Sequence, residues 1–212
     1  MPEVFHDLEQ GTLAWFEARA GIPTASEFKT VQASGKGGGE SVTRAKYLRQ
    51  LAGEILTGEP APAGYSNDHM LRGQEQEDDA RRLFSLITDL EPERVGFVRE
   101  GRAGCSPDSL IGEDAGLEIK CAIPAVQIER LQLGRLPPEH VAQVQGSLWV
   151  TGRKHWWFTS YCPRLPPLIV KVERDEAYIA QLAKAVEAFN EELDAIVDSI
   201  RTYQDFKGQA AA

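Results

Sequence analysis

The chain has 212 residues, of which 42% are hydrophobic, and carries a formal net charge of -9 at pH 7. This length suffices for one compact domain with a sizeable core and does not favour two, so we expect a single domain over residues 1–212. No apolar segment approaches the roughly 20 residues that span a bilayer, and the first residues lack the basic and apolar regions of a signal peptide. We therefore expect a soluble, intracellular protein.

The acidic balance argues against a protein that coats nucleic acid non-specifically, because neutralising phosphates requires clustered Lys and Arg. It does not exclude a nuclease, since a site for divalent cations concentrates carboxylates while basic residues can line one channel. Cys105, Cys121 and Cys162 do not have the close spacing of a zinc knuckle or a redox pair. We expect them to be reduced, partly buried thiols.

In chain order, the sequence predicts short helices, then strands, then a helix, two more strands and a long final helix. Ser41 is typical of the N-cap of a helix that ends at Gly58, and a further helix is expected over about residues 68–87. The glycine-rich segment 34–39 lacks the spacing of a phosphate loop, and we interpret it as a surface loop. The remaining expected elements are strands over 94–99, 104–111 and 116–121, a helix over 138–150, strands over 155–161 and 168–172, and the last helix.

The strongest chemical signal is Pro107-Asp108 followed by Glu118-Ile119-Lys120. Side chains alternate along a strand, so Glu118 and Lys120 share one face of the sheet. If the preceding strand pairs with this one, Asp108 reaches the same place, and the Ile119 carbonyl could add a third oxygen for a hard cation such as magnesium. Such a cation polarises a phosphodiester, while Lys120 positions or deprotonates the attacking water. The alternative is a surface hairpin with an ordinary Glu-Lys pair.

Glu77 lies on the apolar stripe of the helix expected before these strands, together with Ala80, Phe84 and Ile87. A carboxylate directed into a core is costly unless it is paired or coordinates a metal, so Glu77 needs a partner. The Asp108 and Glu118 centre could supply one through a cation. The alternatives are a buried salt bridge to an arginine and a boundary residue that reaches solvent. Its charged neighbours, such as Arg81, are expected on solvated faces.

Five ordered segments extend these patterns over most of the chain, from about Trp15 to Asp175. They are Arg19 to Glu27, Arg72-Gly73 to Ala80-Arg81, the Asp108 to Lys120 motif, Ala142 to Gln145, and Trp149 to Thr151. In order and spacing the sequence resembles the lambda exonuclease family of phage alkaline exonucleases, within the restriction-endonuclease-like nucleases. The resemblance implies an α/β fold with a mixed β-sheet flanked by α-helices.

The resemblance also implies roles for individual residues. Asp108 and Glu118 match metal ligands, assisted by the Ile119 carbonyl, and Glu77 matches an additional acidic residue near the metals. Lys120 matches the catalytic lysine. The implied cofactor is Mg²⁺, for which Mn²⁺ can substitute, with two ions in each active site.

Other matched positions concern the DNA end. Arg19 matches the arginine that binds the terminal 5′-phosphate, with hydroxyls of Thr24 and Ser26 beside it, although a surface ion pair is the usual fate of an arginine. Gln143 matches a polar active-site residue on a helix whose polar stripe could equally be a solvated face. Met70 occupies the place of an apolar residue that wedges into the duplex end, and it could equally belong to the core.

By resemblance, the chain is expected to degrade one strand of linear double-stranded DNA processively from its 5′ end, leaving 3′ single-stranded tails. The family acts as a ring-shaped homotrimer and passes its product to a single-strand annealing protein in phage recombination, here in the bacterial cytoplasm. The alternatives are another metal endonuclease or resolvase of the same fold, and a non-catalytic DNA-binding adaptor. The segment after Cys121, with Gln127 and Arg130, departs from the family pattern, so no DNA contacts are assigned there.

Overall fold

The computed structural model describes residues 1–35, 37, 39, 41–61 and 68–210, and it describes the side chains of these residues except for 68–75 and 204–210. Two of the predictions made above therefore fall partly or wholly outside the described residues. The glycine-rich segment 34–39 is described only in part. The side chain of Met70, the expected wedge, is outside the description, although its backbone belongs to a helix.

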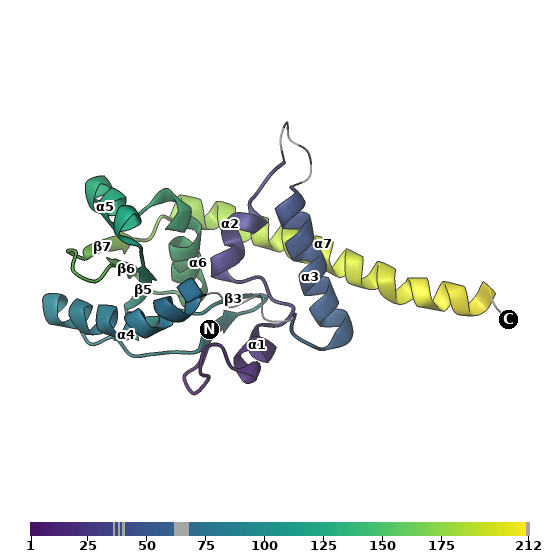
Figure 1. The fold of residues 1–212 in the computed structure, drawn as a ribbon. Helices are drawn as coiled ribbons and strands as arrows, with labels where there is room; N and C mark the ends of the chain where they lie inside the picture. Colours follow the sequence, from purple (N-terminus) through teal and green to yellow (C-terminus); the bar gives the residue numbers. More distant parts are fainter. Residues whose placement is uncertain (36, 38, 40, 62–67, 211–212) are drawn as a thin grey trace.

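The strands form two sheets (Figure 1). The first sheet is antiparallel, with the order β1 (Glu3–Phe5), β2 (Phe97–Glu100) and β3 (Ala103–Cys105). The second is mixed, with the order β4 (Ser109–Ile111), β5 (Ala115–Cys121), β6 (His155–Tyr161) and β7 (Leu168–Glu173), and its β5–β6 pair is parallel. The mixed sheet was predicted, but β1 and the division into two sheets were not.

The prediction of one continuous strand over 104–111 is wrong. The chain leaves the first sheet after Cys105 and enters the second at Ser109. Pro107 stands in between and has no N–H to donate to a ladder, which explains why the strand breaks at this point. The break places Asp108 on a short connection between the two sheets.

Helices surround both sheets, and most begin and end where the sequence indicates. For α3, Ser41 accepts the N-cap hydrogen bond from Arg44 N–H at 3.4 Å, and Gly58 ends the helix at a φ of 72°, as predicted. The helix expected over 138–150 instead begins with a 3-10 turn. The helical elements are α1 (Leu13–Arg19), η1 (Ala25–Glu27), α2 (Phe28–Val31), α3 (Val42–Thr57), α4 (Asp68–Thr88), α5 (Pro124–Leu133), η3 (Pro138–His140), α6 (Val141–Thr151) and α7 (Glu176–Ala210).

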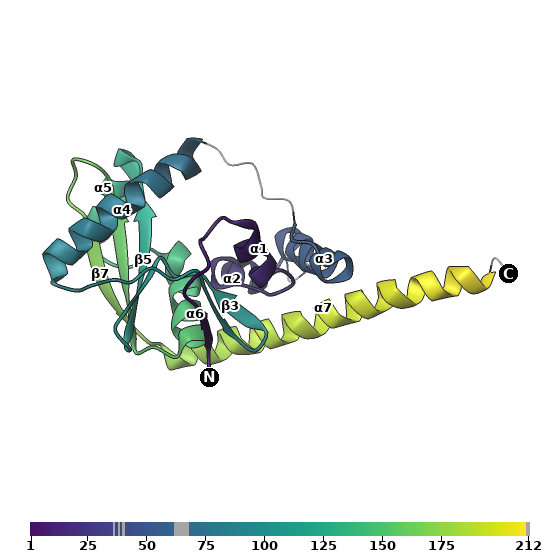
Figure 2. The same cartoon turned by 90° about the horizontal axis from the view of Figure 1, so that it is seen from below.

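Helices α4 and α6 cover opposite sides of the mixed sheet (Figure 2). On the α4 side, Leu117 and Ile119 of β5 pack against Ala80 and Phe84. On the α6 side, Phe158 of β6 packs in a larger cluster of core residues from α6, α3 and α7. Because residues of one strand alternate between these sides, Glu118 and Lys120 face α6.

Helix α7 packs apolar residues against the rest of its own chain. Ile179, Leu182 and Phe189 are buried in the same cluster as Leu48 and Leu51 of α3. The C-terminal half of α7 extends beyond the rest of the molecule in both ribbon views (Figures 1 and 2). None of the helices in the described part of the chain is long and apolar enough to cross a membrane.

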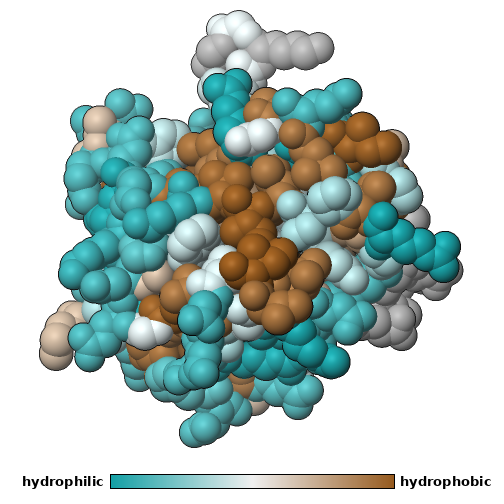
Figure 3. All heavy atoms as spheres, turned by 90° about the vertical axis from the view of Figure 1, so that its left-hand side faces the viewer, coloured by the Kyte–Doolittle hydropathy of each residue, from teal (hydrophilic) through white to brown (hydrophobic). Residues whose placement is uncertain are grey.

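The end of the molecule formed by α4, α5 and the mixed sheet carries a broad apolar band (Figure 3). Exposed apolar side chains on these helices include Leu86 and Ile87 at the end of α4 and Ile128 of α5. Ile87 is 54% exposed, so the predicted apolar stripe of α4 ends at Phe84, which is fully buried.

Candidate active site

Asp108 lies at the edge of the mixed sheet, where β4 begins. Ser109 pairs with Leu117 of β5, and the Asp108 carboxylate accepts a hydrogen bond from Ile119 N–H, with an Oδ2–N distance of 2.5 Å. The N–H and C=O of one strand residue point to the same side of the strand, so the Ile119 carbonyl points toward the same edge. This edge therefore brings a carboxylate and a backbone carbonyl together.

Glu118 extends from β5 toward α6 and is only 2% exposed. Its Oε1 accepts from Lys120 Nζ at 2.6 Å and from Gln143 Nε2 at 2.6 Å. Its Oε2 is also buried but has no hydrogen-bond partner among the residues that the structure describes. A buried carboxylate oxygen without a partner is costly, so this atom fits a cation that the chain itself does not supply.

Charge crowding changes the proton affinity of this cluster. Burial raises the pKa of Asp108 well above its usual value, and the negative charges of Glu118 and Glu77 raise it further. Burial lowers the pKa of Lys120, but Glu118 and Asp108 outweigh it, so the net shift is upward. The cluster thus holds a protonated lysine and carboxylates that repel one another, which a divalent cation would relieve.

Glu77 forms an ion pair with Arg81 and is 31% exposed. The arginine was predicted on a solvated face, and this is wrong. Arg81 is 9% exposed, and it donates to Ser109 Oγ at 2.9 Å and to the Asp108 carbonyl at 3.1 Å. It also pairs with Asp78 at 2.7 Å. The arginine alternative considered for Glu77 is thus present, and Arg81 braces the backbone at Asp108.

The oxygen atoms at this edge of the sheet are suitable ligands for a hard divalent cation. Among the residues that the structure describes, no three His, Cys, Asp or Glu side chains are grouped to hold a metal by themselves. The available ligands are instead the carboxylates of Asp108 and Glu118 and the carbonyl of Ile119, all of which are oxygens of the kind that Mg²⁺ prefers. Glu77 uses one carboxylate oxygen, Oε1, in its contact with Arg81.

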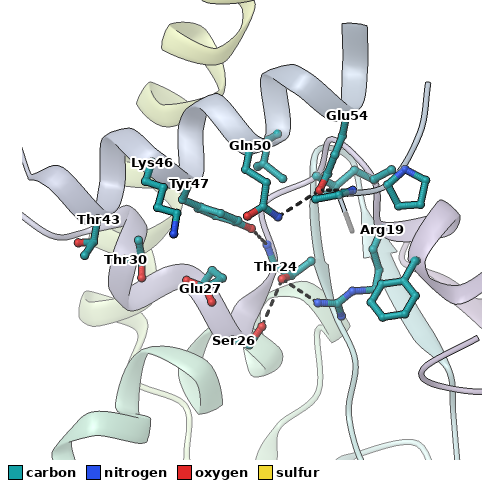
Figure 4. Close-up of a pocket in the computed structure, with 16 residues that line it drawn as sticks. Arg19, Thr24, Ser26, Glu27, Thr30, Thr43, Lys46, Tyr47, Gln50 and Glu54 are labelled. Carbon is teal, nitrogen blue, oxygen red and sulfur yellow. Dashed lines mark hydrogen bonds between the residues drawn. The ribbon is translucent and has the colours of Figure 1, made fainter. Parts of the chain in front are cut away.

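A second polar cluster lies around Arg19, at the end of α1 (Figure 4). Arg19 stacks on the ring of Trp15 at 4.1 Å and donates to Thr24 Oγ1 at 3.3 Å, and the hydroxyls of Thr24 and Ser26 are 3.3 Å apart. Burial lowers its pKa. In the described part of the chain no carboxylate pairs with Arg19, which argues against the ordinary surface ion pair.

These residues line a cavity of about 500 Å³ between α1, η1 and α3. Figure 4 shows side chains of α3 on its far wall, among them Lys46, Tyr47 and Gln50. The Tyr47 hydroxyl accepts from Thr24 N–H at 3.2 Å, which fixes the backbone at the cavity floor. Sequence analysis did not identify these α3 residues, because their helical spacing equally fits core packing.

Ser106 connects the two clusters. Its hydroxyl accepts from Arg19 at 2.5 Å and from Trp15 Nε1 at 3.2 Å, and it lies two residues before Asp108. The sequence pattern did not indicate a role for this serine. Ser106 therefore links the Arg19 cluster, through its hydroxyl, to the chain segment that carries Asp108.

The polar stripe of α6 faces the interior rather than solvent. Gln143 contacts Glu118, Ser147 is 2% exposed, and His140 packs against the ring of Phe158. Burial and the nearby charges of Lys120 and Arg130 lower the pKa of His140 to about 4. The solvated-face alternative for this stripe is therefore wrong.

Comparison with known proteins identifies the family of the chain. The model of the YqaJ-like viral recombinase domain matches residues 14–154. The chain belongs to this family. It is 40% identical over 58 residues to ExoD of Escherichia coli (strain K12), a protein described as uncharacterized, and that match covers 26% of this chain and 67% of ExoD.

Solved structures show the same fold. The chain is 32% identical to an alkaline exonuclease, LHK-Exo, from Laribacter hongkongensis, with a TM-score of 0.81 over 95% of this chain and 100% of that one. The complex of LHK-Exo with dAMP matches at 33% identity with a TM-score of 0.82 over the same shares of the two chains. A phage related exonuclease from Haemophilus somnus 129PT, 16% identical, matches in fold with a TM-score of 0.64 over 84% of this chain and 96% of that one.

These matches confirm the resemblance to the alkaline exonucleases and the predicted fold class. The YqaJ-like protein is thus an alkaline-exonuclease-like nuclease of a recombination-related family.

Proposed function

We propose that this YqaJ-like protein is a Mg²⁺-dependent exonuclease that degrades one strand of linear double-stranded DNA from its 5′ end. The observation that carries the proposal is the buried, unpartnered Oε2 of Glu118 beside Asp108 and Lys120. A buried carboxylate oxygen without a partner calls for a cation, and the neighbouring lysine is poised for phosphodiester chemistry. The strand that remains would carry a 3′ single-stranded tail.

Asp108, Glu118 and the Ile119 carbonyl would hold the metal, with two ions in each active site and Glu77 as an additional acidic residue. A bound Mg²⁺ polarises the scissile phosphate and lowers the pKa of a water ligand, and Mn²⁺ can supply the same chemistry. Gln143 fixes the carboxylate of Glu118 by its hydrogen bond at 2.6 Å. The metal ligand therefore starts from a defined rotamer.

Lys120 completes the site in this proposal. Its contact with Glu118, 2.6 Å from Nζ to Oε1, holds the amine beside the metal edge. The lysine would position or deprotonate the attacking water and offset the charge that develops on the phosphate.

Arg19, with Thr24 and Ser26, would bind the terminal 5′-phosphate. A guanidinium holds a phosphate by parallel charge-assisted hydrogen bonds, and this one has no carboxylate partner among the described residues that would have to be displaced. Ser106 would share the phosphate, since it contacts Arg19 and lies next to the Asp108 loop. The terminal phosphate and the scissile phosphate would then bind at neighbouring positions, at Arg19 and at Asp108.

In this proposal, the oligomeric state of the protein and its partner are inferred from the family resemblance. A homotrimeric ring around the duplex would explain processive digestion without base-specific contacts, and the apolar band of Figure 3 offers surface for contacts between copies. The product strand would pass to a phage single-strand annealing protein in the bacterial cytoplasm. Light scattering of the purified protein should give three times the mass of the 23.4 kDa chain, and a monomer at working concentration would contradict the ring.

The activity is tested with a 5′-end-labelled linear duplex and a covalently closed circle of the same sequence. We expect Mg²⁺-dependent release of label as mononucleotide from the linear duplex, an intact circle, and no release in a chelator. Cleavage of the circle would favour an endonuclease or resolvase. Binding without cleavage of either substrate would favour a DNA-binding adaptor.

A further inference from the structure

Arg130 of α5 is held on the same side of the mixed sheet as Lys120. Its NH1 donates to Ser160 Oγ at 3.0 Å, and Ser160 is the register partner of Lys120 on the neighbouring strand. Paired residues of adjacent strands point their side chains to the same face, about 5 Å apart. The guanidinium therefore lies beside the ammonium of Lys120, on the side away from Asp108 in the strand order β4-β5-β6.

Hydrogen bonds within the protein hold the side chain of Arg130 in place before DNA binds. The Ser160 hydroxyl donates to Gln127 Oε1 at 2.6 Å, and the fully buried Gln127 donates to the carbonyls of Ser160 and Pro166 at 3.1 and 2.8 Å. Arg130 NH2 lies 3.0 Å from His140 Nε2, which is neutral at pH 7 and can accept. This arrangement holds a cation with little conformational freedom left to lose on binding.

Charges of both signs surround Arg130. Burial lowers its pKa, Glu139 and Glu129 act to raise it, and Lys120 lies on the same face of the sheet. Lys120 and Lys29 lie close enough to lower the pKa of His140 together with Arg130, and Lys29 has no ion-pair partner among the described residues. Glu139 approaches Arg130 only to 3.9 Å and is 49% exposed. A guanidinium has five N–H donors, and the contacts to Ser160 and His140 use two of them. In the described part of the chain no carboxylate hydrogen-bonds the guanidinium, so its remaining N–H groups can donate to an anion.

We propose that Arg130 binds a backbone phosphate of the strand being cut, the one that follows the scissile phosphate on its 3′ side. The inference rests on the proposed function. Arg19 and Ser106 lie on the Asp108 side of Lys120, and Arg130 lies on the β6 side. A strand whose 5′-phosphate is at Arg19 and whose scissile phosphate is at Lys120 therefore continues toward Arg130.

The test measures binding, so it does not depend on turnover. The dissociation constant of a 5′-phosphorylated linear duplex is measured by fluorescence anisotropy in a chelator at several salt concentrations, for the unmodified protein, R130Q and R135Q. Arg135 is exposed just beyond α5 and provides a control with the same change of charge. Removing one phosphate contact lowers the slope of log affinity against log salt by about 0.7 to 0.9.

We expect this change of slope in R130Q, with about tenfold weaker binding at moderate salt, and an unchanged slope in R135Q. An R130Q protein that melts at a lower temperature but keeps the full slope would show that Arg130 only braces α5 against His140, and would overturn the inference. Should R130Q fail to fold, R130K keeps the charge, and we expect the full slope with at least threefold weaker binding. Wild-type affinity of R130K would then overturn it.

The activity assay separates this inference from the proposed function. R130Q should digest 5′-phosphorylated and 5′-hydroxyl duplexes with the same ratio of rates as the unmodified protein, because Arg19 is untouched. Absence of any cleavage by the unmodified protein would refute the proposed function, whereas the slope in the chelator would still report whether Arg130 contacts a phosphate.

Discussion

The two polar clusters of this protein differ in charge and in how the fold holds them. The cluster at Asp108 and Glu118 is built on strands of the mixed sheet and concentrates buried negative charge around one protonated lysine. The cluster at Arg19 is built on a helix end and a 3-10 turn, and its guanidinium lies among hydroxyls in a cavity that Lys46, Glu27 and Glu54 also line. The first suits a metal ion and the second suits a phosphate, so one substrate can meet both.

The contrast predicts two kinds of mutational response. Every ligand of a metal is needed for the chemical step, so losses at the sheet should be close to complete. A phosphate held by several donors loses only part of its binding free energy when one donor is removed, so losses at the cavity should be graded. The clusters meet at Ser106-Pro107-Asp108. The loss of activity on substituting a residue of this segment therefore shows whether near-complete or graded loss dominates where the clusters join.

The largest effect is expected from removing a carboxylate. Asp108→Ala and Glu118→Ala should each lower the rate on linear duplex by about 10³-fold or more, because a metal contributes several kcal/mol to the transition state. Initial rates with saturating Mg²⁺ measure this. The melting temperature should not fall in Asp108→Ala, since the charge repulsion from Glu118 is removed with the side chain.

Asp114→Ala is the matched control, because this exposed aspartate forms its ion pair with Lys154 at the surface. Its rate should stay within twofold of the unmodified protein. A rate near that of the unmodified protein in Asp108→Ala or Glu118→Ala would exclude these residues as metal ligands.

Lys120→Ala should give the next largest loss, about 10²- to 10³-fold in turnover, because a preorganised positive charge is removed from the developing charge of the phosphate. Binding of DNA and of the metal should persist, since the carboxylates remain. Isothermal titration with Mn²⁺ and anisotropy with duplex DNA measure the two. Lys154→Ala, which removes a surface lysine paired with Asp114, is the control. Loss of Mn²⁺ binding in Lys120→Ala would assign the lysine a structural role.

Much of this site could be predicted from the sequence because its information is local. Alternation along β5 places Glu118 and Lys120 on one face without knowledge of the rest of the chain. The capped helix α3 and the strand at 155–161 are similarly defined by their own residues. Local periodicity and capping chemistry therefore predict which elements exist and which side chains share a face.

The features that were missed depend on contacts distant in sequence. Arg81 is buried because Ser109 and the Asp108 carbonyl accept its hydrogen bonds, and neither is visible from the charged surroundings of Arg81 in α4. Ser106 gains its contact from Arg19, 87 residues earlier. The break of the strand at Pro107 was signalled by the proline, and giving that residue more weight would have divided the strand correctly.

Arg19→Ala tests the second cluster. Removing a charged hydrogen-bond partner costs roughly 1.5 to 3 kcal/mol, about ten- to a hundredfold in rate on a 5′-phosphorylated duplex. The rate on the 5′-hydroxyl duplex should change much less, so the preference for phosphate should largely disappear. Cleavage that remains should still require Mg²⁺, because the sheet cluster is intact. If Arg19→Ala kept the full preference for the 5′-phosphorylated over the 5′-hydroxyl duplex, Arg19 would not be part of the phosphate site. That result would favour the endonuclease alternative.

The smallest effect is expected from Ser26→Ala. A neutral hydrogen bond contributes about 0.5 to 1.5 kcal/mol net, so the preference for the 5′-phosphate should fall about two- to tenfold. Ser26 is exposed and its hydroxyl bonds only Thr24 among the described residues, so the melting temperature should not change. Thr24 is 3% exposed and would confound binding with folding, which makes Ser26 the better probe. Ser199→Ala, on the far part of α7, is the control. A Ser26→Ala loss as large as that of Arg19→Ala would mean that hydroxyls rather than the guanidinium dominate, and the contrast between an all-or-none sheet and a graded cavity would no longer hold.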